Sequence, residues 1–170
     1  MRGDAEPARM GDALAVALLE ARGFTADDFA RSHPAGALGR RLLLHIRDVM
    51  HGGDEIPAVT AEATLADALM EMSRKRLGMT VVVDDAQRLI GLYTDGDLRR
   101  TLTDPAIDVR NARIADVMTR EPSFVDADAL AVEAARLMET RKITMLPVVD
   151  AERRVVGALN IQDLLRARVV

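Results

Sequence analysis

The sequence has 170 residues, of which 49% are hydrophobic and 29% are charged, and its formal net charge is −4. A chain of this size and composition can bury a core, which excludes a disordered or fibrous protein. The negative charge gives no general attraction to polyphosphate backbones, so we expect no nucleic acid partner. The sequence contains no cysteine, which excludes disulfides, thiolate metal sites and thiol nucleophiles and is typical of a reducing cytoplasm.

Membrane segments are not expected either. No run of about 18 apolar residues occurs, and residues 1–4 lack the apolar stretch of an export signal. We therefore expect a soluble, cytoplasmic protein without a membrane partner. Only 2% of the residues are aromatic, so a bound nucleobase would lie between aliphatic or methionine side chains and not on an aromatic platform.

Residues 1–46 are expected to form a separate helical segment and linker. Residues 12–20 are apolar nearly all round, which predicts a helix that is buried against a partner surface. Gly23 is a suitable stop, and residues 25–29 open a short helix with a capping pattern. Residues 32–41 contain one proline and two glycines and predict a turn-rich segment.

The rest of the chain contains an internal repeat of three blocks in one order. The Asp-Val-Met block at residues 48–50 recurs 68 residues later. The block at residues 77–84 recurs 66 residues later, and so does the block at residues 91–98. Three blocks at nearly one spacing predict two copies of one structural unit.

Each copy begins with an extended stretch and a helix. The extended stretch contains Pro57 in the first copy and Pro122 in the second, and proline biases its predecessor away from helix. A helix follows, with Thr64 as a suitable N-cap in the first copy. Its apolar residues recur at helical spacing in both copies, namely Leu65, Ala68, Leu69 and Met72 in the first, and Leu130, Ala134, Leu137 and Met138 in the second.

A hairpin and a closing helix complete each copy. Residues 79–83 and 145–149 are short, apolar runs, as expected of strands buried on both faces. Polar turns and partner strands follow, and a closing helix is expected to begin near Asp97 or Asp163. The turns are expected at residues 84–88 and 150–154, and the partner strands at residues 89–94 and 155–160.

The expected fold class is therefore α/β of the mixed α+β type. Two pseudo-symmetric β-α-β-β-α copies, at residues 47–106 and 107–170, are expected to pack as a pair after the helical segment at residues 1–46. Neither copy could bury both faces of a small sheet alone, and packing the two together does so.

A candidate binding motif stands at the last strand–helix junction of the first copy. Gly91 permits a close backbone approach, Thr94 offers a hydroxyl to a phosphate, and Asp97 could accept a ribose diol. The helix N-terminus adds amide donors and a favourable dipole for phosphate. Thr and Asp are also usual helix caps, so the spacing alone is equally consistent with a purely structural junction.

The repeat, the Asp-Val-Met starts, the Leu146-Pro147-Val148-Val149-Asp150 strand and the Gly-x-x-Thr-x-x-Asp ending together resemble a cystathionine-β-synthase (CBS) domain pair. In that family the last motif commonly holds the ribose and phosphate of an adenosine-type nucleotide. The resemblance implies one principal site, at Thr94 and Asp97, because Asn160 replaces the hydroxyl in the second copy. Its implied walls are Ile56, Pro57, Gly78, Met79, Thr80, Lys142, Ile143 and Thr144.

Charged residues flank this motif. Arg99 and Arg100 follow it, and Arg141 and Lys142 lie at the matching position of the second copy. Long cationic side chains are mostly solvated, but beside a phosphate or carboxylate they would form charge-assisted bonds. Asp95 is open to the same two interpretations, and we include Asp95 and Arg99 among the candidate ligand-binding residues.

A closer resemblance is carried by residues 11–24, by residues 29–40 with Ser32-His33-Pro34, and by residues 94–100. These are similar to bacterial D-arabinose-5-phosphate isomerases, in which a sugar-isomerase (SIS) domain precedes a CBS pair. Those enzymes interconvert ribulose 5-phosphate and arabinose 5-phosphate in the synthesis of Kdo for lipopolysaccharide. The resemblance makes residues 1–46 the end of the SIS domain, and His33 a remnant of its active site.

Catalysis by this chain alone is not expected. Aldose–ketose isomerisation needs a positioned acid and base together with a phosphate site, and His33 by itself supplies neither. His45 and His51 are not expected to bind a metal, because neither is expected to have a second histidine or carboxylate at a helical i+4 position. We therefore assign no catalytic residue, no metal site and no required cofactor.

Two functions remain open from the sequence. The first is a regulatory module that binds a nucleotide or nucleotide-sugar effector, with CMP-Kdo or an adenosine nucleotide as the candidates. The second is an oligomerisation module without a ligand, which Asn160 and the apolar helix stripes favour. In either case the resemblance implies a homodimer formed through the CBS pairs and a tetramer in the full-length parent.

Overall fold

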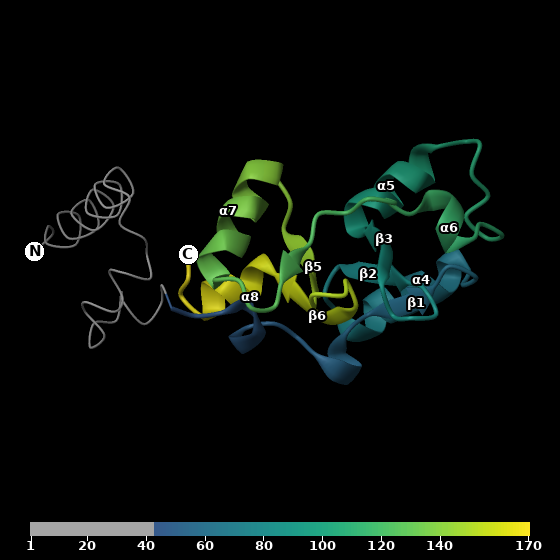
Figure 1. The fold of residues 1–170 in the computed structure, drawn as a ribbon. Coiled ribbons are helices and arrows are strands. Elements are labelled where there is room, and N and C mark those ends of the chain that lie inside the picture. The colour runs from purple at the N-terminus through teal and green to yellow at the C-terminus, as the bar shows by residue number, and fades with distance from the viewer. Residues whose placement is uncertain (1–42) are drawn as a thin grey trace, which may run out of the picture. The chain divides into compact units, whose positions relative to one another are not determined.

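Two three-stranded sheets, each with its own helices, make up the part of the chain that the structure describes (Figure 1). The structure is a computed structural model, and it describes residues 43–170. Residues His45–Val170 form one compact unit. The helices expected at residues 12–20 and 25–29, the turn-rich segment after them and His33 all lie outside the described residues.

Both repeats have the expected order β-α-β-β-α, which confirms the mixed α/β fold. In each sheet the middle strand pairs in parallel with the first strand and antiparallel with the third. The first repeat consists of β1 (Ala58–Thr60), α4 (Leu65–Lys75), β2 (Met79–Val83), β3 (Leu89–Thr94) and α5 (Asp95–Thr103), and the second of β4 (Val125–Asp126), α7 (Ala131–Arg141), β5 (Met145–Val149), β6 (Val155–Asn160) and α8 (Ile161–Arg166). Three short helices precede or join them, namely η1 (Ile46–Asp48), η2 (Gly53–Glu55) and α6 (Ile114–Val117).

The hairpin turns form where the polar runs predict them. The Oδ1 atom of Asp84 accepts hydrogen bonds from the backbone N–H groups of Ala86 and Arg88, at 2.9 and 2.8 Å. Asp150 accepts the equivalent pair in the second repeat. Each turn therefore has a carboxylate that satisfies two amides, and this is the Asx-type geometry for which aspartate is favoured in turns.

The closing helices begin two residues earlier than expected. Thr94 is the N-cap of α5 and Asn160 is the N-cap of α8, so Asp97 and Asp163 are the third helical residues. In both helices the Asp carboxylate turns back to accept a hydrogen bond from the N-cap backbone N–H. This is a capping box, in which the side chain at the third position satisfies a donor at the N-cap. Leu130 is likewise the N-cap of α7 and not part of its apolar stripe.

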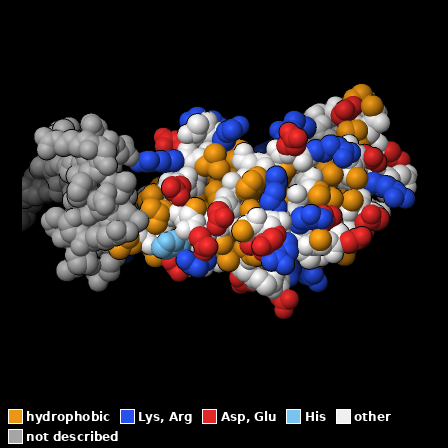
Figure 2. Space-filling view, in the orientation of Figure 1, with side chains coloured by type: hydrophobic (Ala, Val, Ile, Leu, Met, Phe, Trp, Pro, Cys, Tyr) orange, Lys and Arg blue, Asp and Glu red, His pale blue; other side chains and the backbone are white. Residues whose placement is uncertain are grey.

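Charges of both signs are interspersed over the face of the described residues that the space-filling view presents (Figure 2). None of the helices in the described part of the chain is both long and apolar enough to cross a bilayer.

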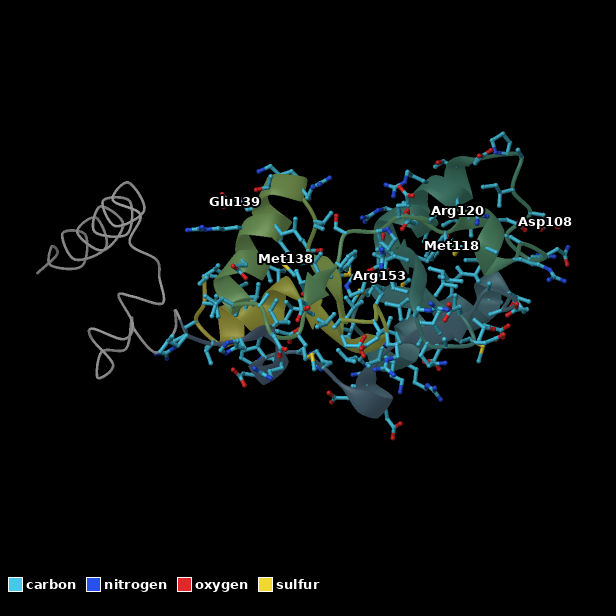
Figure 3. The ribbon with its side chains drawn as sticks, in the orientation of Figure 1. Asp108, Met118, Arg120, Met138, Glu139 and Arg153 are labelled. Carbon is cyan, nitrogen blue, oxygen red and sulfur yellow. The ribbon has the colours of Figure 1, made fainter. Side chains whose placement is uncertain are left out.

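The segment before each repeat packs on the other repeat. His51 pairs with Ala158 of β6, and Thr119 pairs with Leu92 of β3. Beside these bridges, Met50 covers Gly157 and Met118 covers Gly91 so closely that a β-carbon at either glycine would overlap the methionine sulfur. Met118 is labelled in Figure 3. The recurring Asp-Val-Met blocks therefore link the two repeats, because each methionine fills the space above a strand glycine.

A shared core joins the two sheets. It contains Val81 and Leu92 from the first repeat with Val149 and Ala158 from the second, and all four are buried. A second core lies between α4 and the sheet of the first repeat, where Leu65 and Met72 pack with Tyr93. At the hairpin ends, Leu89 N–H donates to the carbonyl of Arg153 at 3.0 Å. The expected packing of the copies as a pair is thus confirmed.

Candidate functional site

The junction of β3 and α5 places the hydroxyl of Thr94 against the carboxylate of Asp97. Thr94 Oγ1 donates to Asp97 Oδ2 at 2.8 Å and accepts a hydrogen bond from the Asp97 N–H at 3.3 Å. The Thr94 N–H donates to the same carboxylate oxygen at 2.8 Å. Oδ2 is therefore used for capping, and Oδ1 is the carboxylate oxygen that faces other groups.

That second oxygen of Asp97 is contacted by a cation and a hydroxyl. Arg100 Nη2 donates to Asp97 Oδ1 at 2.6 Å, and Thr119 Oγ1 lies 3.5 Å from the same atom. The Asp97 side chain is only 10% exposed, whereas that of Arg100 is 74% exposed. An exposed guanidinium can leave a carboxylate at little cost, because a surface ion pair contributes only about 0–1 kcal/mol. Asp97 is therefore a buried acceptor, held by its cap, beside an exposed cation.

The N-terminus of α5 contacts Gly78 of its own repeat, beside Met145 of the second repeat. The Asp95 N–H donates to the Gly78 carbonyl at 3.1 Å. A β-carbon on Gly78 would lie 3.0 Å from Met145 Sδ and 3.1 Å from Asp95 Oδ2, and Gly78 has a φ of +71°. Glycine is needed here for the left-handed backbone and for the close approach of Met145. The geometry thus brings Gly78, Asp95 and Met145 together across the repeats.

Three of the expected wall residues cannot reach a ligand through their side chains in this structure. Met79 and Thr80 have no exposed surface, and Pro57 is also buried. Thr80 Oγ1 donates to the backbone carbonyl of Ala68 at 2.8 Å, so its hydroxyl is used inside the first repeat. The expectation that the Thr80 side chain lines the site is therefore corrected, because Thr80 faces α4. Ile56 is half-buried and packs on the shared core.

The cationic and polar residues of the second repeat are placed differently. Lys142 is the C-cap of α7, has a left-handed backbone and is exposed. Thr144 is also exposed, and its backbone carbonyl accepts a hydrogen bond from the Ile161 N–H at 2.8 Å. Arg99 is exposed on α5, but the guanidinium that contacts Asp97 belongs to Arg100. The i,i+3 spacing of Asp97 and Arg100 on one helix is the sequence signal that could have favoured Arg100.

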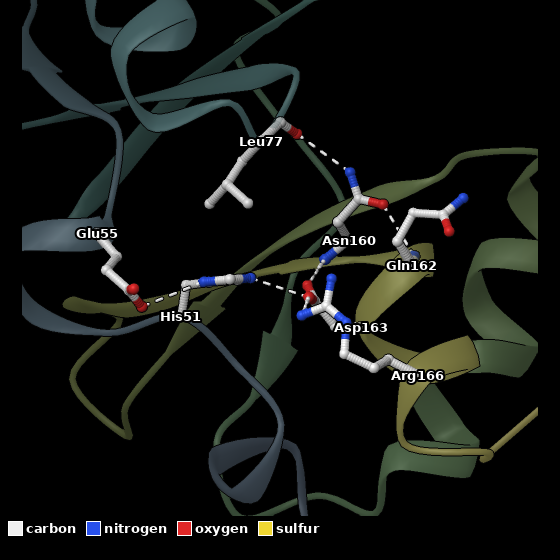
Figure 4. Close-up of polar contacts among 7 residues, drawn as sticks. All are labelled: His51, Glu55, Leu77, Asn160, Gln162, Asp163 and Arg166. Carbon is white, nitrogen blue, oxygen red and sulfur yellow. Dashed lines mark hydrogen bonds and ion pairs between the residues drawn. The ribbon is translucent and has the colours of Figure 1, made fainter.

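The equivalent junction of the second repeat is occupied by contacts within the protein (Figure 4). Asn160 Oδ1 accepts from Gln162 N–H at 3.0 Å, and Asn160 Nδ2 donates to the carbonyl of Leu77 at 3.2 Å. Asp163 Oδ1 lies 2.9 Å from His51 Nε2. Asn160 replaces the threonine of the Gly-x-x-Thr-x-x-Asp motif, and its longer side chain therefore connects the second repeat to Leu77, the residue before Gly78.

His51 also corrects an expectation. Glu55 stands at its i+4 position, and Glu55 Oε2 lies 3.2 Å from His51 Nδ1. Burial opposes a charge on the ring, but the hydrogen bonds and charges of Asp163 and Glu55 outweigh burial and raise the pKa of His51 above its ordinary value of 6.5. Among residues 43–170, no group of three or more histidine and acidic side chains is arranged to hold a metal ion.

Comparison with known proteins places these motifs in a family. The profile of the CBS domain matches residues 46–104 and 114–170. A relative described as arabinose 5-phosphate isomerase KdsD, from Pseudomonas aeruginosa, is 61% identical over 161 residues. The match covers 95% of this chain and 49% of the relative, so the chain spans about half the length of the curated relatives it matches.

Solved structures share the fold. One described as CBSX2 in complex with AMP superposes with a TM-score of 0.63 at 27% identity, covering 74% of this chain and 96% of that chain. The CBS domain pair of protein MJ0100, in complex with 5′-methylthioadenosine and S-adenosyl-L-methionine, superposes with a TM-score of 0.65 at 22% identity, covering 73% of this chain and 94% of that chain.

Proposed function

The chain belongs to the CBS domain family, and from this premise we propose that it is a regulatory module that binds one nucleotide at Thr94 and Asp97. Within a longer protein the module would modulate an arabinose 5-phosphate isomerase, the activity named for relatives of about twice its length. The two repeats would be residues 47–106 and 107–170. Occupancy of the site would affect the isomerase only through a difference in affinity between two states.

The observation that carries this proposal is the pairing of a buried acid with an exposed cation at the start of α5. A ribose diol donates two hydrogen bonds, and the capped, rigid carboxylate of Asp97 is suited to accept them. The displaced guanidinium of Arg100 would remain beside the amide donors at the start of α5, since its Nη1 lies 3.6 Å from the position of a β-carbon on Gly96. A phosphate there would meet both a cation and the positive end of the α5 dipole.

An adenosine nucleotide is the first ligand to test, because the related CBSX2 is described in complex with AMP. A nucleotide sugar with a carboxylate, such as CMP-Kdo, is the second, since feedback by a pathway product would use Arg99, Arg100 and Lys142. Met145 and Ile56 would supply the apolar surface for a base, in keeping with the low aromatic content of the chain.

The test is isothermal titration of AMP and of CMP-Kdo into wild type and into the double variant Thr94→Ala/Asp97→Ala. We expect wild type to bind one of these ligands and the variant to bind neither. The matched control is Thr64→Ala/Asp67→Ala, because these residues form the same capping box at the start of α4. If the control loses binding to the same extent, helix stability and not the site explains the loss. No heat with either ligand in wild type would overturn the proposed ligands.

The alternative, an oligomerisation module, is favoured by exposed apolar side chains on the helices of the first repeat. Met70 on α4 is 70% exposed and Leu102 on α5 is 62% exposed. Under this alternative, Thr94→Ala/Asp97→Ala would split a dimer, whereas under the proposed function it would leave the dimer mass unchanged. Sedimentation equilibrium of Thr94→Ala/Asp97→Ala distinguishes these outcomes. Met70→Ser/Leu102→Ser is the comparison variant, which should split a dimer formed by these helices.

A further inference from the structure

The two acids of the repeated motif have different partners. In the first repeat, Asp97 Oδ1 is 2.6 Å from Arg100 Nη2 and 3.5 Å from Thr119 Oγ1. In the second repeat, Asp163 Oδ1 is 2.9 Å from His51 Nε2, and Arg166 Nη1 is 3.8 Å away. Thr119 and His51 occupy equivalent places, because each follows the methionine of an Asp-Val-Met block. In the second repeat, His51 thus takes the place beside Oδ1 of Asp163 that Arg100 has beside Oδ1 of Asp97 in the first repeat.

Both ring nitrogens of His51 face carboxylates. Nε2 contacts Asp163, whose side chain is 5% exposed, and Nδ1 contacts Glu55, whose side chain is 69% exposed. A neutral imidazole has one N–H and can donate to only one of these carboxylates, whereas an imidazolium donates to both. The arrangement in Figure 4, with one carboxylate oxygen beside each ring nitrogen, therefore suits a doubly protonated ring. The charged groups that face it in the described part of the chain are Glu55 from η2, and Asp163 with the more distant Arg166 from α8.

This contact reaches the proposed ligand site. Glu55 directly precedes Ile56 and Pro57, and the carbonyl of Pro57 accepts the Val81 N–H of β2 at 2.8 Å. His51 is itself held to β6 by two backbone hydrogen bonds with Ala158, both at 2.9 Å. A charged His51 thus joins α8 of the second repeat to the segment that carries Ile56, which the proposed function places beside the base.

We propose that Asp163, His51 and Glu55 form a clasp between the repeats, which closes only when His51 is protonated. In this assignment Asp163 does not serve a second ligand, and His51 is a positioning residue for Ile56, which forms the wall. The inference rests on the proposed function and adds to it a ligand count of one and a dependence on pH. Closing the clasp fixes the wall before the ligand arrives, so affinity is higher when His51 is charged.

The test uses AMP as the probe and calorimetry at about pH 6 and about pH 8, on either side of the histidine transition. We expect one AMP per chain. At the lower pH, wild type should bind AMP several-fold more tightly than His51→Gln does. At the higher pH the two proteins should bind AMP with the same affinity. His45→Gln is the matched control, since His45 lies 3.9 Å from Asp48 and makes no contact with Asp163. The ionisation of the AMP phosphate is the same for all variants and cancels from the comparison.

A second measurement does not depend on any ligand. Proton NMR titration of the His51 ring should give a pKa above its ordinary value. This pKa should fall in Asp163→Asn, and it should fall by less in Glu55→Gln. Glu55 is exposed, so that variant folds even if Asp163→Asn does not. The free energy of unfolding of wild type, relative to His51→Gln, should be largest below about pH 6.5 and decline as the pH rises through the folded pKa.

The outcomes separate the clasp from the proposed function. If AMP fails to bind at either pH while the NMR and unfolding results are as expected, the clasp stands and the choice of ligand fails. If AMP binds but wild type and His51→Gln show the same pH dependence, the clasp is refuted and the proposed function stands. Two AMP molecules per chain, or a pKa of His51 that Glu55→Gln and Asp163→Asn leave unchanged, would also refute the clasp.

Discussion

The side-chain amide of Asn160 donates a hydrogen bond to the backbone carbonyl of Leu77 at 3.2 Å. Asn160 belongs to the motif of the second repeat, and Leu77 precedes Gly78, which contacts Asp95 and Met145. A threonine at this position would keep the N-cap but would be too short to reach the other repeat. The departure from the motif at residue 160 is therefore a contact between repeats.

We predict that Asn160→Thr lowers the free energy of unfolding by about 1 kcal/mol, the typical net contribution of one hydrogen bond. Asn160→Ala should cost more, because it also removes the N-cap of α8 and a cap contributes about another 1 kcal/mol. Urea denaturation of the three proteins measures both differences. Equal midpoints for wild type and Asn160→Thr would show that the contact with Leu77 contributes nothing.

Replacing Thr80 by valine tests the buried hydroxyl. Thr80→Val keeps the shape of the side chain but removes its hydrogen bond to the Ala68 carbonyl, so we expect a loss of about 1 kcal/mol in the free energy of unfolding. Ligand affinity should be unchanged, because the hydroxyl faces α4 and not the site. A large loss of ligand affinity in a protein that remains folded would place Thr80 in the site after all.

The two strand glycines should differ in their tolerance of alanine. At Gly91 the three atoms nearest to the new methyl group all belong to the flexible side chain of Met118. At Gly157 the methyl group would meet Met50 and also lie 3.1 Å from the backbone oxygen of His51. Overpacking typically costs about 1–3 kcal/mol, and we expect Gly157→Ala to be the more destabilising. Met118→Ala should restore part of the stability lost in Gly91→Ala, because the two residues are in contact. Additive effects in that double variant would contradict the packing.

The turn acids should make stability depend on low pH. The hydrogen bond from the Arg88 N–H lowers the pKa of Asp84 below its ordinary value of 3.8, despite the cost of partial desolvation. A lowered folded pKa stabilises the protein above the unfolded pKa, and that stability is lost as the pH falls through the folded pKa. Thermal unfolding of Asp84→Asn should therefore differ from that of wild type near neutral pH and converge with it below about pH 4. Asp85→Asn, which removes the same charge one residue along the same exposed turn, is the control variant.

Most of the architecture could be predicted from the sequence, because it follows from local patterns and their repetition. Residues 89–94 and 155–160 are strands with the expected bounds, and both carboxylate-capped turns lie where Asp84 and Asp150 indicate. α5 and α8 begin two residues before the position that the sequence predicts, because each aspartate is the third helical residue and reaches back to the N-cap.

The candidate site could be predicted only in part. Thr94 and Asp97 are brought together as their spacing indicates, whereas Met79 and Thr80 are buried. The contact of Arg100 with Asp97 was not predicted. Spacing alone does not predict the contacts of Met145, Asn160 and His51. Their partners are Gly78, Leu77 and Asp163, which lie 67 to 112 residues away in the chain.

The sequence by itself determined the repeat, the element order and the capped junction, because each depends on residues within a few positions of one another and on a recurring pattern. The tertiary structure decided which repeat each Asp-Val-Met block covers, which acid meets a histidine and which meets an arginine. The physical reason is that these contacts join segments far apart in the chain, and short-range electrostatics and packing act only after the core of the two sheets has brought them within a few ångströms.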